Sequence, residues 1–307
     1  MPTTDTTLDQ ELAGLDHLEL HEQRRRPVSL RLWATLWPKL AAIGLVLATW
    51  ELAVWREWRP RYLLPSPSDV GARLGDDLGT AELWRAVGFT MRRAVLGFAL
   101  ALLIGAIVGL AVSQVRTLRV AVGSLITGLQ TMPSIAWFPL AILLFKLSEQ
   151  AIMFVVVLGA APSIANGIIS GIDHVPPILR KVGTSMGGGT VSLYRDFIIP
   201  ASLPSTVSGL KQGWAFSWRS LMAGELLVVI PGTQSLGTRL AFARELSDST
   251  GVIATMMVIL VIGIAVDSLV FGRAERVMLR RRGLLNDEAP ASKLRRRRDL
   301  VAASAPG

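Results

Sequence analysis

The sequence predicts an all-α, polytopic membrane protein with about six transmembrane helices. Hydrophobic residues make up 51% of its 307 residues, and a mean hydropathy of +0.46 is too high for a soluble domain of this length. The apolar residues are also gathered into runs long enough to cross a bilayer, which takes about 20 residues of helix. Polar segments rich in proline, glycine and charge separate these runs. We therefore interpret the chain as a bundle of membrane-spanning helices.

The N-terminal segment, 1–38, is expected to form a cytoplasmic tail. It is polar and rich in acidic residues, which are followed by three consecutive arginines, Arg24 to Arg26. No apolar core follows a short basic start, so the segment does not resemble a cleavable signal peptide. The first span, 40–55, is short and contains Glu51, and tryptophans crowd its ends as interfacial aromatic residues do.

The second and third spans differ in how their helices are interrupted. The second, 94–113, contains Gly97, Gly105 and Gly109, and we expect these small residues to let neighbouring helices approach closely. The third, 120–145, is free of charge but contains two prolines, so its helix should break or kink. Because broken helices inside membranes often line a pathway, Pro133 and Pro139 are candidate pathway residues.

The fifth span, 203–230, contains three charged residues. Lys211 lies close enough to the span end to reach water, whereas Arg219 is near the middle, where a charge is costly. We expect Arg219 either to pair with an acid such as Glu225 or to face a water-filled route, and the sequence leaves both open. At 100° per residue Lys211 shares one face with Trp218, Met222 and Glu225, so that face should look inward.

Between the fourth span, 151–172, and the fifth lies a polar loop, 174–203, with three consecutive glycines, Gly187 to Gly189. Such a loop cannot lie in hydrocarbon, which offers no partners for its freed backbone groups. We predict two short helices, 177–186 and 190–199, folded about the glycines. On the second helix the expected apolar side consists of Val191, Tyr194, Phe197 and Ile198, and the expected polar side of Ser192, Arg195 and Asp196.

The sixth span, 251–272, leads into a basic tail, 277–307, with arginine runs at 280–282 and 295–298. Threading six spans from a cytoplasmic N-terminus places both tails and the polar loop in the cytoplasm. Lys and Arg outside the spans are about twice as numerous on that side, although this bias depends on the tails. The net charge of +9 therefore indicates membrane topology rather than nucleic-acid binding.

Enzymatic chemistry finds no support in the sequence. The chain has no cysteine, its three histidines are scattered, and no span contains a clustered catalytic set. The GGGT at 187–190 lacks the lysine of a phosphate-binding loop and follows no predicted strand. We predict no catalytic residue, no metal and no cofactor, so any ATP that drives the protein would be bound by another chain.

The spacing of glycine and proline in the polar loop resembles that of a loop motif in a known protein family. Gly187 is followed thirteen residues later by Pro200, with an apolar run before the proline. This resembles the EAA loop of ABC-importer permeases, roughly EAA-x3-G followed by I-x-LP. Lys181, Val182 and Gly183 stand where Glu-Ala-Ala is expected, so the first half of the loop departs from the pattern. The strings LPSPSDV, 64–70, and GWAFSWRSLMAGELL, 213–227, resemble the nitrate, sulfonate and taurine branch.

This resemblance, which covers about 63–276, implies a type I ABC-importer permease fold over 39–276. The loop would be a coupling helix that docks onto a separate ATPase subunit through Lys181, Gly183, Gly187, Gly188, Tyr194, Phe197 and Pro200. Two copies of the chain would form the pathway in a bacterial plasma membrane, with both termini cytoplasmic. The implied cargo is a small anion such as an aliphatic sulfonate, taurine or nitrate, delivered by an extracytoplasmic binding protein. The candidate pathway residues are Pro133, Pro139, Trp218, Arg219, Met222 and Glu225.

Two other function classes remain open at this point. An ion-coupled secondary transporter would need buried acids and inverted repeats. Glu225 and Asp267 are the available acids, and no repeat is visible. An intramembrane enzyme is disfavoured by the missing catalytic set.

Overall fold

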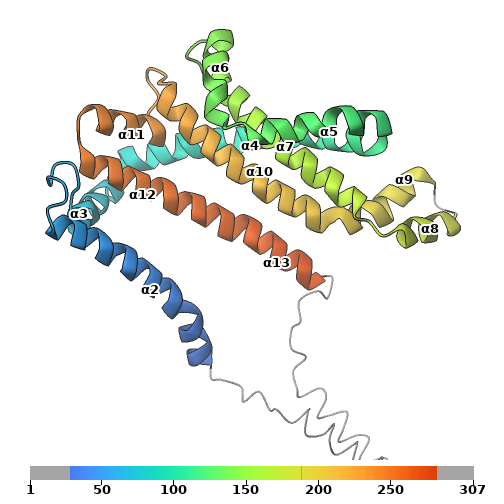
Figure 1. Cartoon of the computed structure of the whole chain (residues 1–307), viewed down its shortest axis with the longest axis horizontal. Coiled ribbons are helices and arrows are strands. Elements are labelled where there is room, and N and C mark those ends of the chain that lie inside the picture. The colour runs from blue at the N-terminus through green and yellow to red at the C-terminus, as the bar shows by residue number, and fades with distance from the viewer. Residues whose placement is uncertain (1–27, 188, 282–307) are drawn as a thin grey trace, which may run out of the picture. The chain divides into compact units, whose positions relative to one another are not determined.

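The computed structural model describes residues 28–187 and 189–281, and every regular element in them is helical (Figure 1). The all-α prediction is therefore confirmed for this part of the chain. In order, the elements are α2 (Val28–Trp55), α3 (Pro67–Leu78), α4 (Ala81–Gln114), α5 (Arg116–Thr131), η1 (Ser134–Trp137), α6 (Phe138–Phe145), α7 (Glu149–Asp173), α8 (Pro177–Ser185), α9 (Thr190–Ser192), η2 (Leu193–Ile198), α10 (Ile199–Leu227), α11 (Leu236–Glu245), α12 (Ser249–Val266), η3 (Asp267–Phe271) and α13 (Gly272–Arg281).

The chain divides into two compact units after Pro67. In the first unit, α2 begins at Val28 and runs through Pro38, so the helix starts well before the expected span. Near its end, the indole N–H of Trp50 donates a hydrogen bond to the carbonyl of Pro65 at 3.1 Å, which fastens the following loop to the helix. The expected tail up to residue 27 lies outside the described residues, as does the arginine-rich segment after 281.

Four described helical stretches are long and apolar enough to cross a membrane: Leu36–Trp55, Ala81–Gln114, Glu149–Asp173 and Ser249–Arg280. A fifth candidate is the pair Thr117–Thr131 and Ser134–Phe145, which is bent by 102°. The remaining predicted span corresponds to α10, a helix of 29 residues. Its charged residues lower its mean hydropathy. At 1.5 Å per residue it is about 44 Å long, which is more than the thickness of the hydrocarbon core of a bilayer, about 30 Å.

The predicted break in the third span is confirmed, and it occurs at one of the two prolines. Pro133 lies between α5 and η1 in an extended conformation, where the two halves of the span turn away from each other. Pro139 instead occupies the first turn of α6. A proline is tolerated there because the first N–H groups of a helix have no partner within the helix. Of the two prolines in the predicted break, Pro133 therefore marks the break and Pro139 is accommodated within a helix.

Helix α7 is the centre of the second unit, with α4 packed on one side and α10 on the other. Glycines allow these contacts. A Cβ atom added to Gly105 would lie 2.8 Å from the carbonyl oxygen of Ala161, and one added to Gly209 would lie 2.5 Å from the Cα of Gly167. The packing role predicted for the α4 glycines is confirmed, because any side chain at these positions would push α7 away.

Candidate functional site

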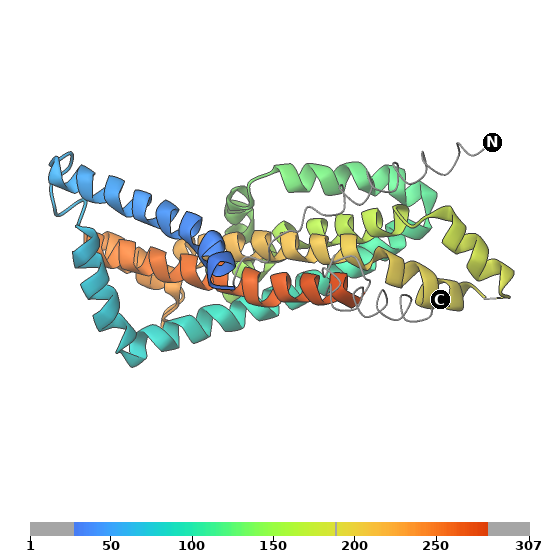
Figure 2. The same ribbon diagram turned by 90° about the horizontal axis from the view of Figure 1, so that it is seen from below.

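The polar loop forms a helical hairpin, as predicted. Helix α8 ends at Ser185, and Gly187 follows with a φ of +76°, a conformation that favours glycine. Its N–H donates to the carbonyl of Thr184 at 3.1 Å, which closes the end of the helix. The returning arm, α9 and η2, differs from the expectation because it is largely a π-turn that runs into α10 without a break. Figures 1 and 2 show this hairpin at one end of the long helices and α11 at the other.

The two arms of the hairpin cross at Gly183. This glycine is buried, and a Cβ atom there would lie 2.5 Å from Cδ1 of Leu193 and 3.2 Å from Cδ2 of Phe197. The missing side chain therefore explains why glycine occupies this position, where the resembling family has alanine. Of the other predicted docking residues, Lys181 is exposed, Pro200 lies in the first turn of α10, and Gly188 lies outside the described residues.

The predicted apolar side of the returning arm is only partly correct. Tyr194 is half-buried against the cluster of α4 and α7 residues that surrounds Ile198, and Phe197 is half-buried over Gly183. Val191 was expected on the same side but is 81% exposed. It lies at the tip of the hairpin, beyond the reach of the core.

An exposed apolar stripe runs along α8. Ile178, Val182 and Met186 follow one another at four-residue spacing and are 62%, 40% and 73% exposed, respectively. Residues four apart share one helix face, and Val191 adds a further exposed apolar side chain at the tip. Sequence reasoning missed this stripe, although its spacing is visible in the sequence.

A buried charge network occupies the opposite end of the bundle. Glu225 is fully buried, and its two carboxylate oxygens accept hydrogen bonds from Arg93 Nη1 at 3.1 Å, Thr90 Oγ1 at 2.8 Å and the Gly237 N–H at 3.1 Å. Arg93 also donates to Glu149 Oε1 at 2.8 Å. The network therefore joins α4, the start of α7, the end of α10 and the start of α11.

This network corrects the expectations for Glu225. Glu225 pairs with Arg93 rather than Arg219, and it is enclosed within the protomer instead of lying on an open face. Sequence reasoning began the second span at residue 94 and so left Arg93 outside it. The sequence predicts a helix from about Ala81 that leads into this span, and the structure confirms it: α4 runs from Ala81 to Gln114, so Arg93 lies well inside the helix.

Arg219 is exposed and has no acidic partner among the described residues. Its Nε donates to the carbonyl of Ala215 at 3.1 Å, and its guanidinium lies 4.7 Å from the centroid of the Phe216 ring. The neighbouring candidates Trp218 and Met222 are half-buried against the core, where Trp218 stacks on Trp214 with ring centroids 6.2 Å apart. Arg219 is thus held by its own helix and points away from the core.

The other two charges predicted near span ends form a pair. Lys211 Nζ lies 3.5 Å from Oδ2 of Asp267, and both side chains are about two-fifths exposed. The sequence predicts only that Lys211 reaches water from near the end of its span. The pair instead links α10 to η3.

Comparisons with known proteins agree with this architecture. The family model for "Binding-protein-dependent transport system inner membrane component" matches residues 87–277. A Methanocaldococcus jannaschii protein named as an ABC transporter permease is 32% identical over 62% of this chain and 70% of its own length. The taurine transport system permease of Escherichia coli is 25% identical over 80% of this chain and 89% of its own. The bicarbonate transport system permease of Synechococcus elongatus is 25% identical over 76% of this chain and 82% of its own length.

A solved structure shares the fold. One chain of the inward-facing MetNI methionine ABC transporter superposes with a TM-score of 0.54 and 21% identity, over 64% of this chain and 96% of that chain.

Proposed function

The chain belongs to the family of binding-protein-dependent transport system inner membrane components, and we propose that it forms the pathway of an ATP-driven importer for small anions. It is a multi-pass permease subunit of an ABC importer with the type I fold, and its relatives place it in the nitrate, sulfonate and taurine branch. The proposed assembly contains two copies of the chain, two ATPase subunits that bind the ATP, and an extracytoplasmic binding protein.

The exposed stripe Ile178, Val182 and Met186 is the observation that carries the proposed coupling role. Apolar side chains gathered on a polar hairpin beyond the spans are typical of a docking surface. An amphipathic helix that lays its apolar face into a groove is a common mode of protein recognition. We assign the groove to the ATPase subunit, with the exposed Lys181 at the rim. The hairpin and both termini would then face the cytoplasm.

The connection between the hairpin and α10 supports a coupling mechanism. Because η2 continues into α10 without a break, a displacement of the hairpin is passed directly to α10. The far end of α10 is held by the Glu225 network. Movement of the docked hairpins as the ATPases close would therefore reorient α10 and alternate access between the two sides of the membrane.

The proposal of an anionic cargo depends on Arg219. An exposed guanidinium within a predicted span is costly in lipid, so we place it where two copies enclose a hydrated pathway, available to a carboxylate, sulfonate or bicarbonate. The relatives named for taurine and bicarbonate favour the same class. Pro133, Pro139, Trp218 and Met222 are the other proposed pathway residues, whereas the burial of Glu225 favours a structural role for it.

An ion-coupled transporter is less consistent with the charges. Its two candidate acids both have basic partners, since Glu225 pairs with Arg93 and Asp267 with Lys211. The test is reconstitution of the chain with its ATPase and binding protein in proteoliposomes. We expect uptake of taurine, sulfonates or bicarbonate that requires ATP inside the vesicle. Uptake driven by a proton or sodium gradient without ATP would contradict the proposal.

A further inference from the structure

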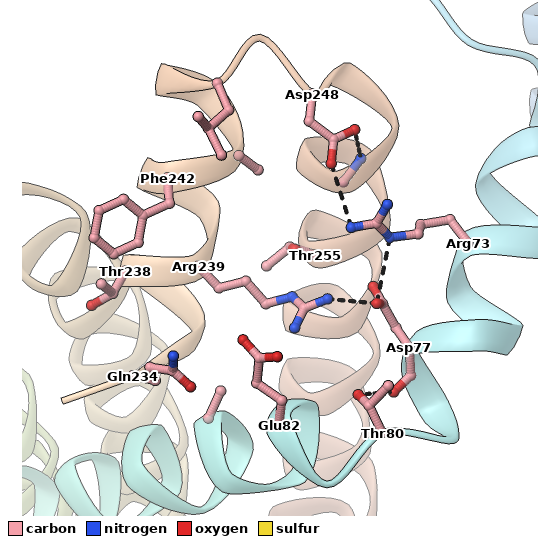
Figure 3. Close-up of a pocket in the computed structure, with 14 residues that line it drawn as sticks. Arg73, Asp77, Thr80, Glu82, Gln234, Thr238, Arg239, Phe242, Asp248 and Thr255 are labelled. Atoms are coloured by element: carbon pink, nitrogen blue, oxygen red, sulfur yellow. Dashed lines mark hydrogen bonds and ion pairs between the residues drawn. The ribbon is translucent and has the colours of Figure 1, made fainter. Parts of the chain in front are cut away.

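A polar cavity of about 280 Å³ lies at the end of the second unit remote from the hairpin, where α3, α4, α11 and α12 meet. Helix α4 begins beside it at Ala81 and α12 at Ser249. Figure 3 shows side chains from all four helices pointing into one space. None of these residues was singled out in the sequence, because they come from segments far apart in the chain.

Four paired charges build the wall of the cavity. Asp77 lies 2.6 Å from Arg239 Nη2 and 3.4 Å from Arg73 Nε. Asp248 lies 3.5 Å from Arg73 Nη2 and also accepts the Gly251 N–H at 2.9 Å, which caps α12. These contacts fix the wall in place, because each carboxylate is held by at least two donors.

Three polar side chains of the lining, those of Glu82, Gln234 and Thr255, have no hydrogen bond or ion pair in the described residues. The carboxylate of Glu82, in the first turn of α4, belongs to an exposed residue and has no hydrogen bond or ion pair in the described residues, and Figure 3 shows it directed into the cavity. Thr255 of α12 is 2% exposed, lines the same cavity, and its hydroxyl has no hydrogen-bond partner. The Thr255 hydroxyl is one of six buried side-chain polar atoms without a protein partner in the described residues, and a water molecule or a ligand group would satisfy it.

The charge of the lining specifies the kind of group that fits. Its two arginines are outnumbered by three acids, Asp77, Asp248 and Glu82, so one negative charge is uncompensated. An ammonium or guanidinium group would neutralise Glu82 and donate a hydrogen bond to the hydroxyl of Thr255, which can accept.

The rim of the cavity favours a protein over a free solute. Phe242 and Leu246 lie one turn apart on α11, line the cavity, and are 49% and 79% exposed. Exposed apolar side chains around a charged centre are the arrangement found at protein–protein contacts with one dominant anchor. A solute site would instead enclose such side chains.

We propose that this cavity is a socket for a lysine or arginine side chain of the docked substrate-binding protein. The inference rests on the proposed function, which puts the hairpin in the cytoplasm and this end outside. The basic side chain enters between Phe242 and Leu246, pairs with Glu82 and bonds to Thr255. Docking is therefore directed by a cation on the binding protein and an acid on the permease.

The test uses the permease–ATPase complex in nanodiscs and its cognate binding protein. We expect Glu82→Gln to weaken binding about tenfold and to reduce its salt dependence, because a steering charge is lost. Glu82→Lys should abolish binding-protein-stimulated ATP hydrolysis, and one Lys→Glu or Arg→Glu variant of the binding protein should restore it. Glu245→Gln is the matched control, since Glu245 is an exposed acid on α11 outside the cavity, and it should bind like wild type.

Three results would overturn the socket. Wild-type stimulation with unchanged affinity in both Glu82 variants would reject it while leaving the proposed function intact. If Glu245→Gln weakened binding of the binding protein as much as Glu82→Gln does, the effect would come from the overall charge of this end of the permease and not from the cavity. Saturable binding of free L-arginine that Glu82→Gln removes, with normal binding-protein affinity, would make the cavity a solute site. If the binding protein never stimulates the wild-type complex, the proposed function fails as well.

Discussion

Arg93 and Glu225 form an ion pair of 3.1 Å although 132 residues separate them in the sequence. Their side chains are 5% and 0% exposed, so the pair is almost completely withdrawn from solvent. Removing one partner of such a pair leaves the other charge buried and uncompensated, which is far costlier than losing the attraction itself. The pair therefore dictates how the end of α10 is attached to α4.

Arg93→Met is expected to destabilise the protein by about 3–5 kcal/mol, the range measured when a buried ion pair loses one member. Adding Glu225→Gln should recover part of this loss, because the carboxamide oxygen can still accept from Thr90. Thermal unfolding in detergent measures both. Arg92→Gln is the control, since Arg92 is the exposed neighbour of Arg93 and its loss should have little effect. Equal melting temperatures for Arg93→Met and Arg92→Gln would contradict the structural role.

Met186→Asp should weaken association with the ATPase subunit by more than tenfold, because it places a charge on the most exposed side chain of the stripe that forms the proposed apolar contact. Copurification of the ATPase and ATP-dependent uptake are the measurements. Thr184→Asp provides the matched control. Thr184 is also exposed on α8 but points about 160° away from Met186. If both variants retain the ATPase equally, the stripe is not the docking face.

Gly187→Pro is expected to abolish the hairpin geometry, because proline requires a φ near −65° whereas Gly187 has +76°. Gly187→Ala should cost about 1 kcal/mol through the same strain. In both cases the spans should still insert, and transport should fall more than protein amount. Gly189→Ala serves as control, since nothing lies within 4 Å of a Cβ atom there. Full coupling in Gly187→Pro would rule out this account of the turn.

Arg219→Gln is expected to lower anion uptake severalfold without lowering the melting temperature, because the hydrogen bond and the ring contact of Arg219 are both made within α10. Arg219→Glu should reduce uptake further by repelling the cargo. If Arg219 instead pairs with an acid of the second copy, both variants should lose dimer stability. Uptake and crosslinking at Trp218, measured together, separate the two cases, and unchanged uptake would exclude a pathway role.

The features that the sequence predicted correctly depend on local chemistry. Apolar runs indicate spans because hydrocarbon admits little else, Pro133 breaks its helix by removing a donor, and Gly187 permits a turn that other residues resist. These constraints act within a few residues of the chain. They can therefore be recognised without knowing the three-dimensional arrangement.

The features that were missed depend on partners distant in sequence. Nothing near Glu225 in the sequence indicates that Arg93 will reach it before Arg219 does. The spacing of Ile178, Val182 and Met186 fits a buried face as well as an exposed one, and only the fold shows that it is exposed. The cavity next to Glu82 combines four helices, and no local pattern predicts their meeting.

The close contact between Gly167 and Gly209 has a mechanical consequence. Two backbones touch there with no side chains between them, so a tilt of α10 about this point would bear on backbone atoms of α7. Gly209 lies ten residues from the Ile199 end of α10 and eighteen from the Leu227 end, or about 15 Å and 27 Å at 1.5 Å per residue. The contact thus divides α10 into a short segment on the hairpin side and a longer segment on the far side, and α10 would pivot between them. A tilt that moves the hairpin end would therefore act over the longer segment on the Glu225 network, which holds the far end of α10.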